Sequence, residues 1–125
     1  MDYPIKEALK ARENAYSPYS KFCVGAAILC KNGNVYTGCN IENASYSVTV
    51  CAERVAIGNA ISHGDKAFKA IVICSSSDDY CYPCGVCRQT LSEFCNGEFE
   101  IVLAKNEEEY KVYRLSELLP ESFKL

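Results

Sequence analysis

The spacing of apolar positions along the chain switches between that of helices and that of strands. From Ile5 to Ala15 or Tyr16, apolar side chains recur every three or four residues, which predicts an amphipathic helix that stops at Ser17-Pro18. Two more helices are expected, at residues 51–61 and 85–95. Apolar runs predict strands at residues 22–30, 35–39, 70–74, 101–104 and 110–113. Because strands and helices alternate, we expect one mixed α/β domain over residues 1–125, with the helices packed on a sheet.

Turn and capping residues define the expected ends of these elements. Asn32-Gly33 is a two-residue hairpin signal, so the first two strands are expected to pair antiparallel. Thr49 is expected to cap the second helix, and His63-Gly64 to end it. Pro83 is expected in the first turn of the third helix, which should end near Asn96-Gly97.

Charge and hydropathy exclude several classes of partner. The chain has 125 residues and a net charge of −3, and no two of its 13 Lys and Arg residues are adjacent. Without a basic tract, we expect no nucleic-acid partner and no anionic membrane surface as a partner. The longest apolar run, Cys23 to Cys30, is far shorter than the ~20 residues of a membrane span. Because Asp2, Lys6 and Glu7 stand where a signal peptide needs an apolar core, we predict a cytoplasmic protein.

The nine cysteines do not have the pattern of a disulfide framework, because nine is odd and no secretion signal is expected. Four of them lie in or beside apolar runs, where a thiol behaves as a small hydrophobe: Cys23, Cys30, Cys39 and Cys74. Cys51, Cys84 and Cys87 have a different setting. Cys51 and Cys84 fall at predicted helix starts, where free amides and the helix dipole favour thiolates.

These three cysteines are candidate zinc ligands. Cys87 lies one helical turn after Cys84, so both sulfurs can bind one ion. Three thiolates and one open position are typical of a catalytic zinc site. Cys81 or Cys95 could instead supply a fourth ligand, which would close the site and make it structural.

Two charged residues beside Cys51 have candidate roles. Glu53 does not share a helical face with Cys51, so it is a poor ligand but a suitable general acid and base beside the open position. Its alternative role is that of a first-turn glutamate stabilised by the helix dipole. Three thiolates and Zn²⁺ sum to −1, and Arg54, on the same face as Cys51, can offset that charge by donating to the thiolate. Arg88 is a weaker candidate of the same kind.

Five segments of the chain resemble known deaminases. Cys51-Ala52-Glu53 and the run Pro83-Cys84-Gly85-Val86-Cys87-Arg88-Gln89 resemble the signature of zinc-dependent nucleoside deaminases, in which the glutamate is not a ligand. Residues 15–26, 38–44 and 118–123 are similar to the small cytidine deaminase family. This resemblance implies a three-layer α/β/α fold with a mixed sheet of about five strands. The sequence differs from the family pattern at Val50, Tyr82 and Val86, which affects substrate fit only.

The resemblance also implies an activity, in pyrimidine salvage. Cytidine and deoxycytidine would be hydrolysed to uridine and deoxyuridine with release of ammonia, using one zinc per subunit. Zinc-bound hydroxide would attack carbon 4 while Glu53 carries the proton to ring nitrogen 3 and then to the departing amine. Two alternatives stay open: deamination of a cytosine nucleoside antibiotic, and a closed structural zinc module that binds another protein.

The same resemblance assigns the substrate contacts. Asn40 and Glu42 share a face of an extended segment and would bind the ribose, although without the family they would be assigned to a turn. Phe22 would form an aromatic wall against the base, with Ala52 beside it, although a strand phenylalanine is more often core. The family forms homotetramers with active sites at subunit interfaces. Residues expected to reach a neighbouring site are Ala44, Tyr46 and Phe123.

Overall fold

The computed structural model describes residues 2–125. Along the chain the elements are α1 (Ile5–Arg12), β1 (Val24–Cys30), β2 (Val35–Cys39), the 3-10 turn η1 (Tyr46–Val48), α2 (Ala52–Ser62), β3 (Phe68–Ser75), α3 (Gly85–Phe94), β4 (Glu100–Ala104), β5 (Tyr110–Arg114) and α4 (Leu115–Leu118). All the helices and strands expected from the sequence are present, within a few residues of their expected ends.

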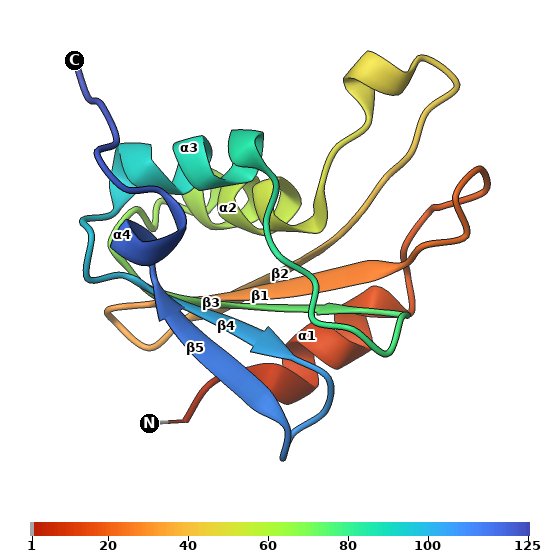
Figure 1. The fold of residues 1–125 in the computed structure, drawn as a ribbon, viewed down its shortest axis with the longest axis horizontal. Helices are drawn as coiled ribbons and strands as arrows, with labels where there is room; N and C mark the ends of the chain where they lie inside the picture. Colours follow the sequence, from red (N-terminus) through yellow and green to blue (C-terminus); the bar gives the residue numbers. More distant parts are fainter. Residues whose placement is uncertain (1) are drawn as a thin grey trace.

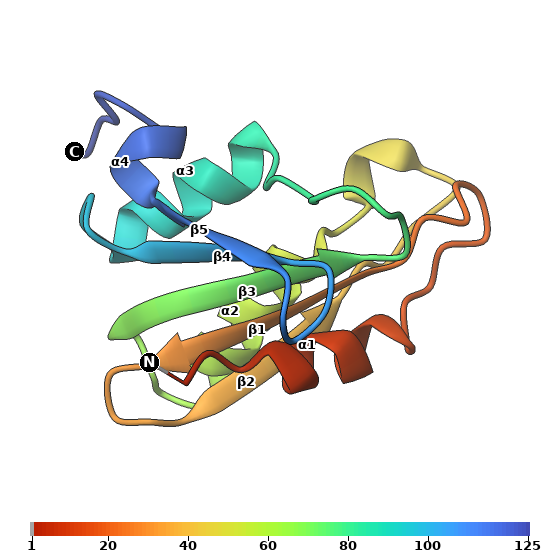
Figure 2. The same cartoon turned by 60° about the horizontal axis from the view of Figure 1, so that its bottom comes forward.

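The five strands form one mixed sheet in the order β2-β1-β3-β4-β5. β1 pairs antiparallel with β2 and β3, β3 pairs parallel with β4, and β4 pairs antiparallel with β5. Helix α1 lies on one face, and α2, α3 and α4 lie on the other (Figures 1 and 2). The predicted three-layer α/β/α fold is therefore confirmed. The single domain over residues 1–125 stays a prediction, which the one shared sheet supports.

Both faces of the central strand β3 are buried, which explains its continuous apolar sequence. Ile71 and Ile73 belong to the core beneath α2 and α3, whereas Val72 and Cys74 belong to the core beneath α1. This alternation follows from the two-residue period of a strand. Within residues 2–125, no helix combines the length and the apolar character that crossing a membrane requires.

The β1–β2 hairpin differs from the predicted two-residue turn. The Cys30 amide donates to Asn34 O at 2.8 Å, which leaves a loop of three residues, 31–33. Gly33 has φ +95°, the left-handed conformation that the last residue of a three-residue hairpin loop adopts. The β1 strand also begins at Val24 rather than Phe22, and the Phe22 carbonyl accepts a bond from the Asn40 side chain, at Nδ2, at 2.7 Å.

The predicted first helix is too long at its C-terminal end. It ends at Arg12, and the chain then joins an extended segment, where Tyr16 N donates to Asn40 O at 2.9 Å. This pairing with a distant segment prevents the helix from continuing to Ala15 or Tyr16.

Cysteines occupy the N-caps of both site helices. Cys51 is the N-cap of α2, and Thr49, the predicted cap, instead accepts a bond from Asn43 N at 3.2 Å through its hydroxyl. Cys84 is the N-cap of α3, so Pro83 lies just before that helix rather than in its first turn. His63 and Gly64 end α2 as expected, and Gly64 has φ +90°.

Helix α2 packs directly on the backbone of β2 at Gly38. A Cβ at Gly38 would lie 2.4 Å from Ala56 N and 2.5 Å from Ala52 O, whereas a Cβ at Gly58 would have no atom within 4 Å. We expect G38A to lower the free energy of unfolding by about 1–3 kcal/mol or more, because backbone must move. The control G58A, inside α2, should raise it by about 0.5–1 kcal/mol. Chemical denaturation measures both, and equal effects would contradict this packing.

A carboxylate joins the hairpin to the end of α2. Asp65 accepts bonds from Tyr36 OH at 2.5 Å, Asn32 Nδ2 at 2.9 Å and Asn34 Nδ2 at 3.0 Å. These bonds, that of Tyr36 foremost, lower the pKa of Asp65 below its ordinary value. Its contribution to stability is therefore complete above the ordinary carboxyl pKa of ~4 and is lost as the pH falls through the lowered value.

We expect D65N to be less stable than the wild-type protein at neutral pH, because the amide cannot replace the charge-assisted bonds. The difference should shrink in acid, where the wild-type carboxylate is also protonated. Urea denaturation of both proteins across this pH range measures it, and a difference that grows in acid would show that the carboxylate is not the cause.

Candidate zinc centre and active site

Three sulfurs meet where the N-termini of α2 and α3 converge. Cys51 and Cys84 are the N-caps of the two helices, neither side chain makes a capping hydrogen bond, and Cys87 lies in the first turn of α3. The Cys51 and Cys84 sulfurs are 3.8 Å apart, and those of Cys84 and Cys87 are 3.5 Å apart. Two thiolates ~2.3 Å from a tetrahedral zinc ion lie about 3.8 Å apart, so the three sulfurs fit zinc.

The cluster contains three protein ligands rather than four. Among residues 2–125, it is the one group of three or more His, Cys, Asp or Glu side chains close enough to share an ion. Cys95 is the C-cap of α3, at the opposite end of the helix from Cys84. Cys81 lies in the segment before α3, and its sulfur is not part of the group. A closed site with a fourth cysteine is therefore not supported.

The protonation of the three thiols is coupled. Hydrogen bonds from Cys87, Arg54 and Cys84 lower the pKa of Cys51 to about 5, and the bond from Cys87 contributes most. The pKa of Cys87 is raised, first because its proton is held by Cys51 and then by burial. Without metal, the negative charge therefore lies mainly on Cys51, and zinc binding must displace the proton of Cys87.

Glu53 lies beside this cluster in the first turn of α2. Its side chain is buried, with 4% of the residue exposed, and it is not a member of the sulfur group. Burial, with a smaller contribution from the Cys51 charge, raises its pKa to about 7. A carboxyl group with this pKa can both accept and donate a proton near neutral pH.

The two arginine candidates have different surroundings. Arg54 Nη2 lies 3.8 Å from Cys51 Sγ and 3.3 Å from Thr49 O, so its charge stands next to a thiolate as the sequence predicts. Arg88 instead donates to Pro83 O at 2.7 Å and to Leu118 O at 2.6 Å. Arg88 therefore fixes the start of α3 against α4, and the weaker prediction that it contacts a thiolate is wrong.

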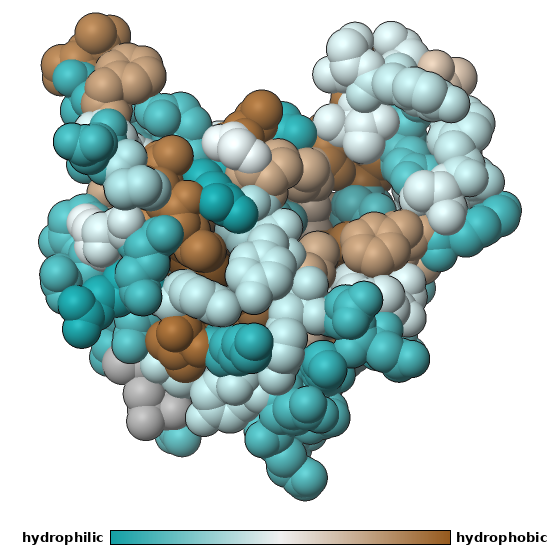
Figure 3. All heavy atoms as spheres, in the orientation of Figure 1, coloured by the Kyte–Doolittle hydropathy of each residue, from teal (hydrophilic) through white to brown (hydrophobic). Residues whose placement is uncertain are grey.

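A cavity of about 180 Å³ opens over the cluster, in the hollowed surface between the C-terminal tail and the 40–50 segment (Figure 3). Ala52 and Glu53 are buried at its floor, while Phe22 and Tyr82 are 39% and 45% exposed at its rim. Four chain segments line it: Phe22 and Val24 at the start of β1; Asn40 after β2; Thr49, Val50, Cys51, Ala52 and Glu53 at the start of α2; and Cys81, Tyr82 and Cys84 before α3. Our sequence interpretation gave no role to Val24, because an apolar side chain carries no chemical signature, and it gave Thr49 and Cys81 no place in the wall of a cavity.

The two residues predicted to bind ribose line different cavities. The Asn40 amide is bound to backbone on both sides, to Phe22 O at 2.7 Å and to Val24 N at 2.9 Å. Glu42 lines a neighbouring cavity of about 380 Å³ that shares Thr49 with the first. Its carboxylate accepts bonds from the Tyr19 and Ser20 amides, and from the Ser20 hydroxyl first of all, which lowers its pKa.

The residues predicted to act across subunits lie away from the zinc cavity of their own chain. Tyr46 is 78% exposed and lines the neighbouring cavity with Glu42. Phe123 is 66% exposed in the C-terminal tail, and Ala44 is exposed in the 40–50 segment. Neither Ala44 nor Phe123 lines the cavity over the sulfurs.

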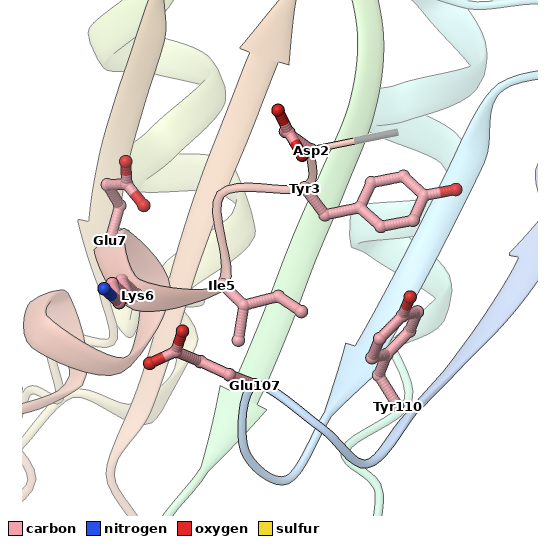
Figure 4. A pocket seen from close by; sticks show the side chains of 7 residues that line it. All are labelled: Asp2, Tyr3, Ile5, Lys6, Glu7, Glu107 and Tyr110. Carbon is pink, nitrogen blue, oxygen red and sulfur yellow. The ribbon is translucent and has the colours of Figure 1, made fainter.

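A wider cavity, of about 430 Å³, lies at the start of α1 (Figure 4). Its polar side chains come from the chain terminus, α1, the β4–β5 turn and β5, and it contains no cysteine. The Tyr3 hydroxyl is already bonded to Glu100 Oε1 at 3.0 Å. Despite its size, this cavity therefore lacks the metal ligands and the buried acid that the smaller one has.

Comparison with known proteins agrees with this geometry. The family model for the zinc-binding region of cytidine and deoxycytidylate deaminases matches residues 2–103. The chain belongs to this family. The cytidine deaminase of Sporosarcina psychrophila is 47% identical over 119 residues, covering 95% of this chain and 88% of that protein. The cytidine deaminase of Halalkalibacterium halodurans is 46% identical, covering 95% of this chain and 90% of that protein.

Solved structures of the family have the same fold. The crystal structure of cytidine deaminase from Burkholderia pseudomallei has a TM-score of 0.89 at 41% identity and covers 95% of each chain. That of cytidine deaminase from Mycobacterium tuberculosis has a TM-score of 0.82 at 39% identity, covering 96% of this chain and 94% of that one. Family membership and the sulfur cluster together confirm the predicted zinc cofactor.

Replacing a cysteine of the cluster with serine should weaken zinc binding. We expect C87S to weaken zinc binding by more than the ~10–100-fold that loss of an outer contact costs, and R54A to weaken it within that range. The matched control C81S alters a cavity cysteine outside the group and should keep zinc. Metal analysis and competition with a chelator measure all three, and loss of zinc from C81S would place a fourth ligand in the site.

Proposed function

We propose that this chain catalyses the hydrolytic deamination of cytidine and deoxycytidine to uridine and deoxyuridine, with release of ammonia, as a step in pyrimidine salvage. The observation that carries the proposal is a three-sulfur cluster with Glu53 buried beside it on the floor of one cavity. A structural zinc module would need a fourth ligand, which the cluster lacks. Relatives named cytidine deaminase favour this substrate over a nucleoside antibiotic.

The chemistry divides between the metal and Glu53. Cys51, Cys84 and Cys87 would hold zinc, whose Lewis acidity would make water a nucleophile near neutral pH. Glu53 takes a proton from the attacking water and delivers it to ring nitrogen 3 of the pyrimidine. It then helps to protonate the departing amine, so that cytidine and water give uridine and ammonia. Burial of Glu53 suits this role, because a pKa of about 7 allows the proton to move in both directions.

The cavity supplies contacts for the base. Phe22, at the rim, can pack against the pyrimidine face, and Ala52, at the floor, leaves room for the ring next to Glu53. Arg54 would offset the negative charge of the Cys51 thiolate when the metal is bound.

Asn40 and Glu42 would bind the sugar. Asn40 uses one donor and one acceptor on backbone, and its amide keeps a second N–H for a ribose hydroxyl. Glu42 is kept ionised by its lowered pKa, so it can accept a bond from a hydroxyl donor. Because the two residues line adjacent cavities that share Thr49, a nucleoside would extend from one cavity into the other.

We infer that four copies assemble with active sites at their interfaces. Large apolar side chains are exposed in the segments at residues 16–19 and 41–48, and a partner subunit would cover them. They are Tyr16, Tyr19, Ile41, Tyr46 and Val48. In that assembly Ala44, Tyr46 and Phe123 would contact a neighbouring site, which accounts for their exposure within one chain. The nine unpaired thiols suit a reducing, cytoplasmic setting.

Replacing the proposed proton carrier should separate catalysis from metal binding. We expect E53Q to lower kcat for cytidine by about 10²–10⁴-fold or more, because the amide cannot carry the proton. Zinc content should stay at one per chain, since Glu53 is outside the sulfur group. Ultraviolet absorbance follows cytidine loss, with metal analysis on the same samples. Absence of uridine formation by the zinc-loaded wild-type protein would overturn the function, and near-normal activity of E53Q would overturn the role of Glu53.

A further inference from the structure

Tyr82 forms the rim of the zinc cavity on the side of the metal ligands. It lies in the segment between β3 and α3, two residues before Cys84, and lines the cavity with Cys81 and Cys84. It is the one aromatic side chain on that side of the cavity within residues 2–125.

The Tyr82 ring is held in place by a residue of β5, the edge strand of the sheet. Its hydroxyl lies 3.0 Å from that of Tyr113 on β5, and the ring centroids are 5.7 Å apart at an interplanar angle of 58°. The same segment has a second attachment, because the Tyr80 ring lies 4.7 Å from Lys105 Nζ and 4.8 Å from Lys111 Nζ. Cation–π contacts at this distance are favourable. An exposed tyrosine at the mouth of a cavity is thereby kept in one orientation.

The location of the ring determines which part of a substrate it meets. The carbon that loses its amino group must face the sulfur cluster and Glu53. The amino group therefore lies on the cysteine side of the cavity. The sugar would extend away from that side, toward Asn40 and the neighbouring cavity. Of the side chains on the cysteine side, Tyr82 is the bulkiest, and it is 45% exposed rather than part of the packed core.

We propose that Tyr82, held in place by Tyr113, is a specificity-determining residue that excludes cytidines carrying a substituent on the exocyclic amine. This inference rests on the proposed deaminase function. A methyl group on that nitrogen extends toward the ring, and a ring tied at its hydroxyl cannot move aside without losing the bond to Tyr113. Water would still be the only co-reactant, because N4-methylcytidine and water give uridine and methylamine.

Replacing Tyr82 with a smaller residue should allow cytidines with a substituted exocyclic amine to react. We expect Y82A to raise the ratio of kcat/KM for N4-methylcytidine to that for cytidine by about 10-fold or more, within the ~10–200-fold that one methylene is worth in a pocket. Y110A is the matched control, because Tyr110 is also an exposed tyrosine but lines the separate cavity at the start of α1, and its ratio should equal that of wild type. A ratio for Y82A within twofold of wild type would overturn the proposal.

The hydrogen bond between the two tyrosines has its own test. Y82F and Y113F each remove one hydroxyl and keep both rings, so each should raise the ratio by a similar factor smaller than that of Y82A. The double variant should show no further increase, because both changes break the same bond. Independent, additive effects of Y82F and Y113F, or no effect of Y113F, would overturn the role of Tyr113.

Measurements of substrate binding distinguish a failure of this proposal about Tyr82 from a failure of the proposed deaminase function. In an E53Q background, where turnover is removed, calorimetry gives dissociation constants for cytidine and for N4-methylcytidine with and without Y82A. The ratio of these constants should move toward one when Tyr82 is shortened, and an unchanged ratio would overturn the proposal. Failure of the wild-type protein to deaminate cytidine would overturn the function alone. Zinc content and thermal unfolding of each variant identify any that fail to fold.

Discussion

The site depends on the convergence of two helix N-termini over one face of the sheet. Because α2 begins at Cys51 and α3 begins at Cys84, two thiols that are 33 residues apart come within 3.8 Å. The N-terminal amides and dipoles of both helices favour negative charge at this point. Three thiols and a buried carboxyl group are tolerated together here for that reason, with Arg54 supplying a full positive charge.

The rest of the fold holds these two helix ends in place. Gly38 lets α2 approach the backbone of β2 with no side chain between them. The parallel pairing of β3 with β4 requires a crossover, which α3 supplies on the same face as α2. Arg88 then fixes the start of α3 by bonds to Pro83 O and Leu118 O. Arg88, although next to the ligand Cys87 in the sequence, is thus a positioning group rather than a charge partner.

The surroundings of the cluster divide into a buried floor and an exposed rim. Glu53 owes its raised pKa to burial, whereas Glu42, only eleven residues earlier and held by hydroxyl and amide donors, has a lowered one. Two carboxyl groups with opposite shifts suit opposite tasks, proton transfer and fixed negative charge. At the rim, Phe22 and Tyr82 face solvent in a single chain, and Tyr82 is oriented by a residue of a distant strand.

Local sequence determined the elements and the chemistry of the donors, because both depend on residues close together in the chain. The strands, the helices, the Cys84–Cys87 pair and the spacing of Glu53 from Cys51 are all of this kind. Tertiary structure decided what depends on distant segments meeting. It ended α1 early through the Tyr16 pairing, bound the Asn40 side chain to backbone, and brought Tyr82 to Tyr113. Periodicity and capping rules describe one segment at a time, whereas these contacts arise only when the sheet order places separate segments side by side.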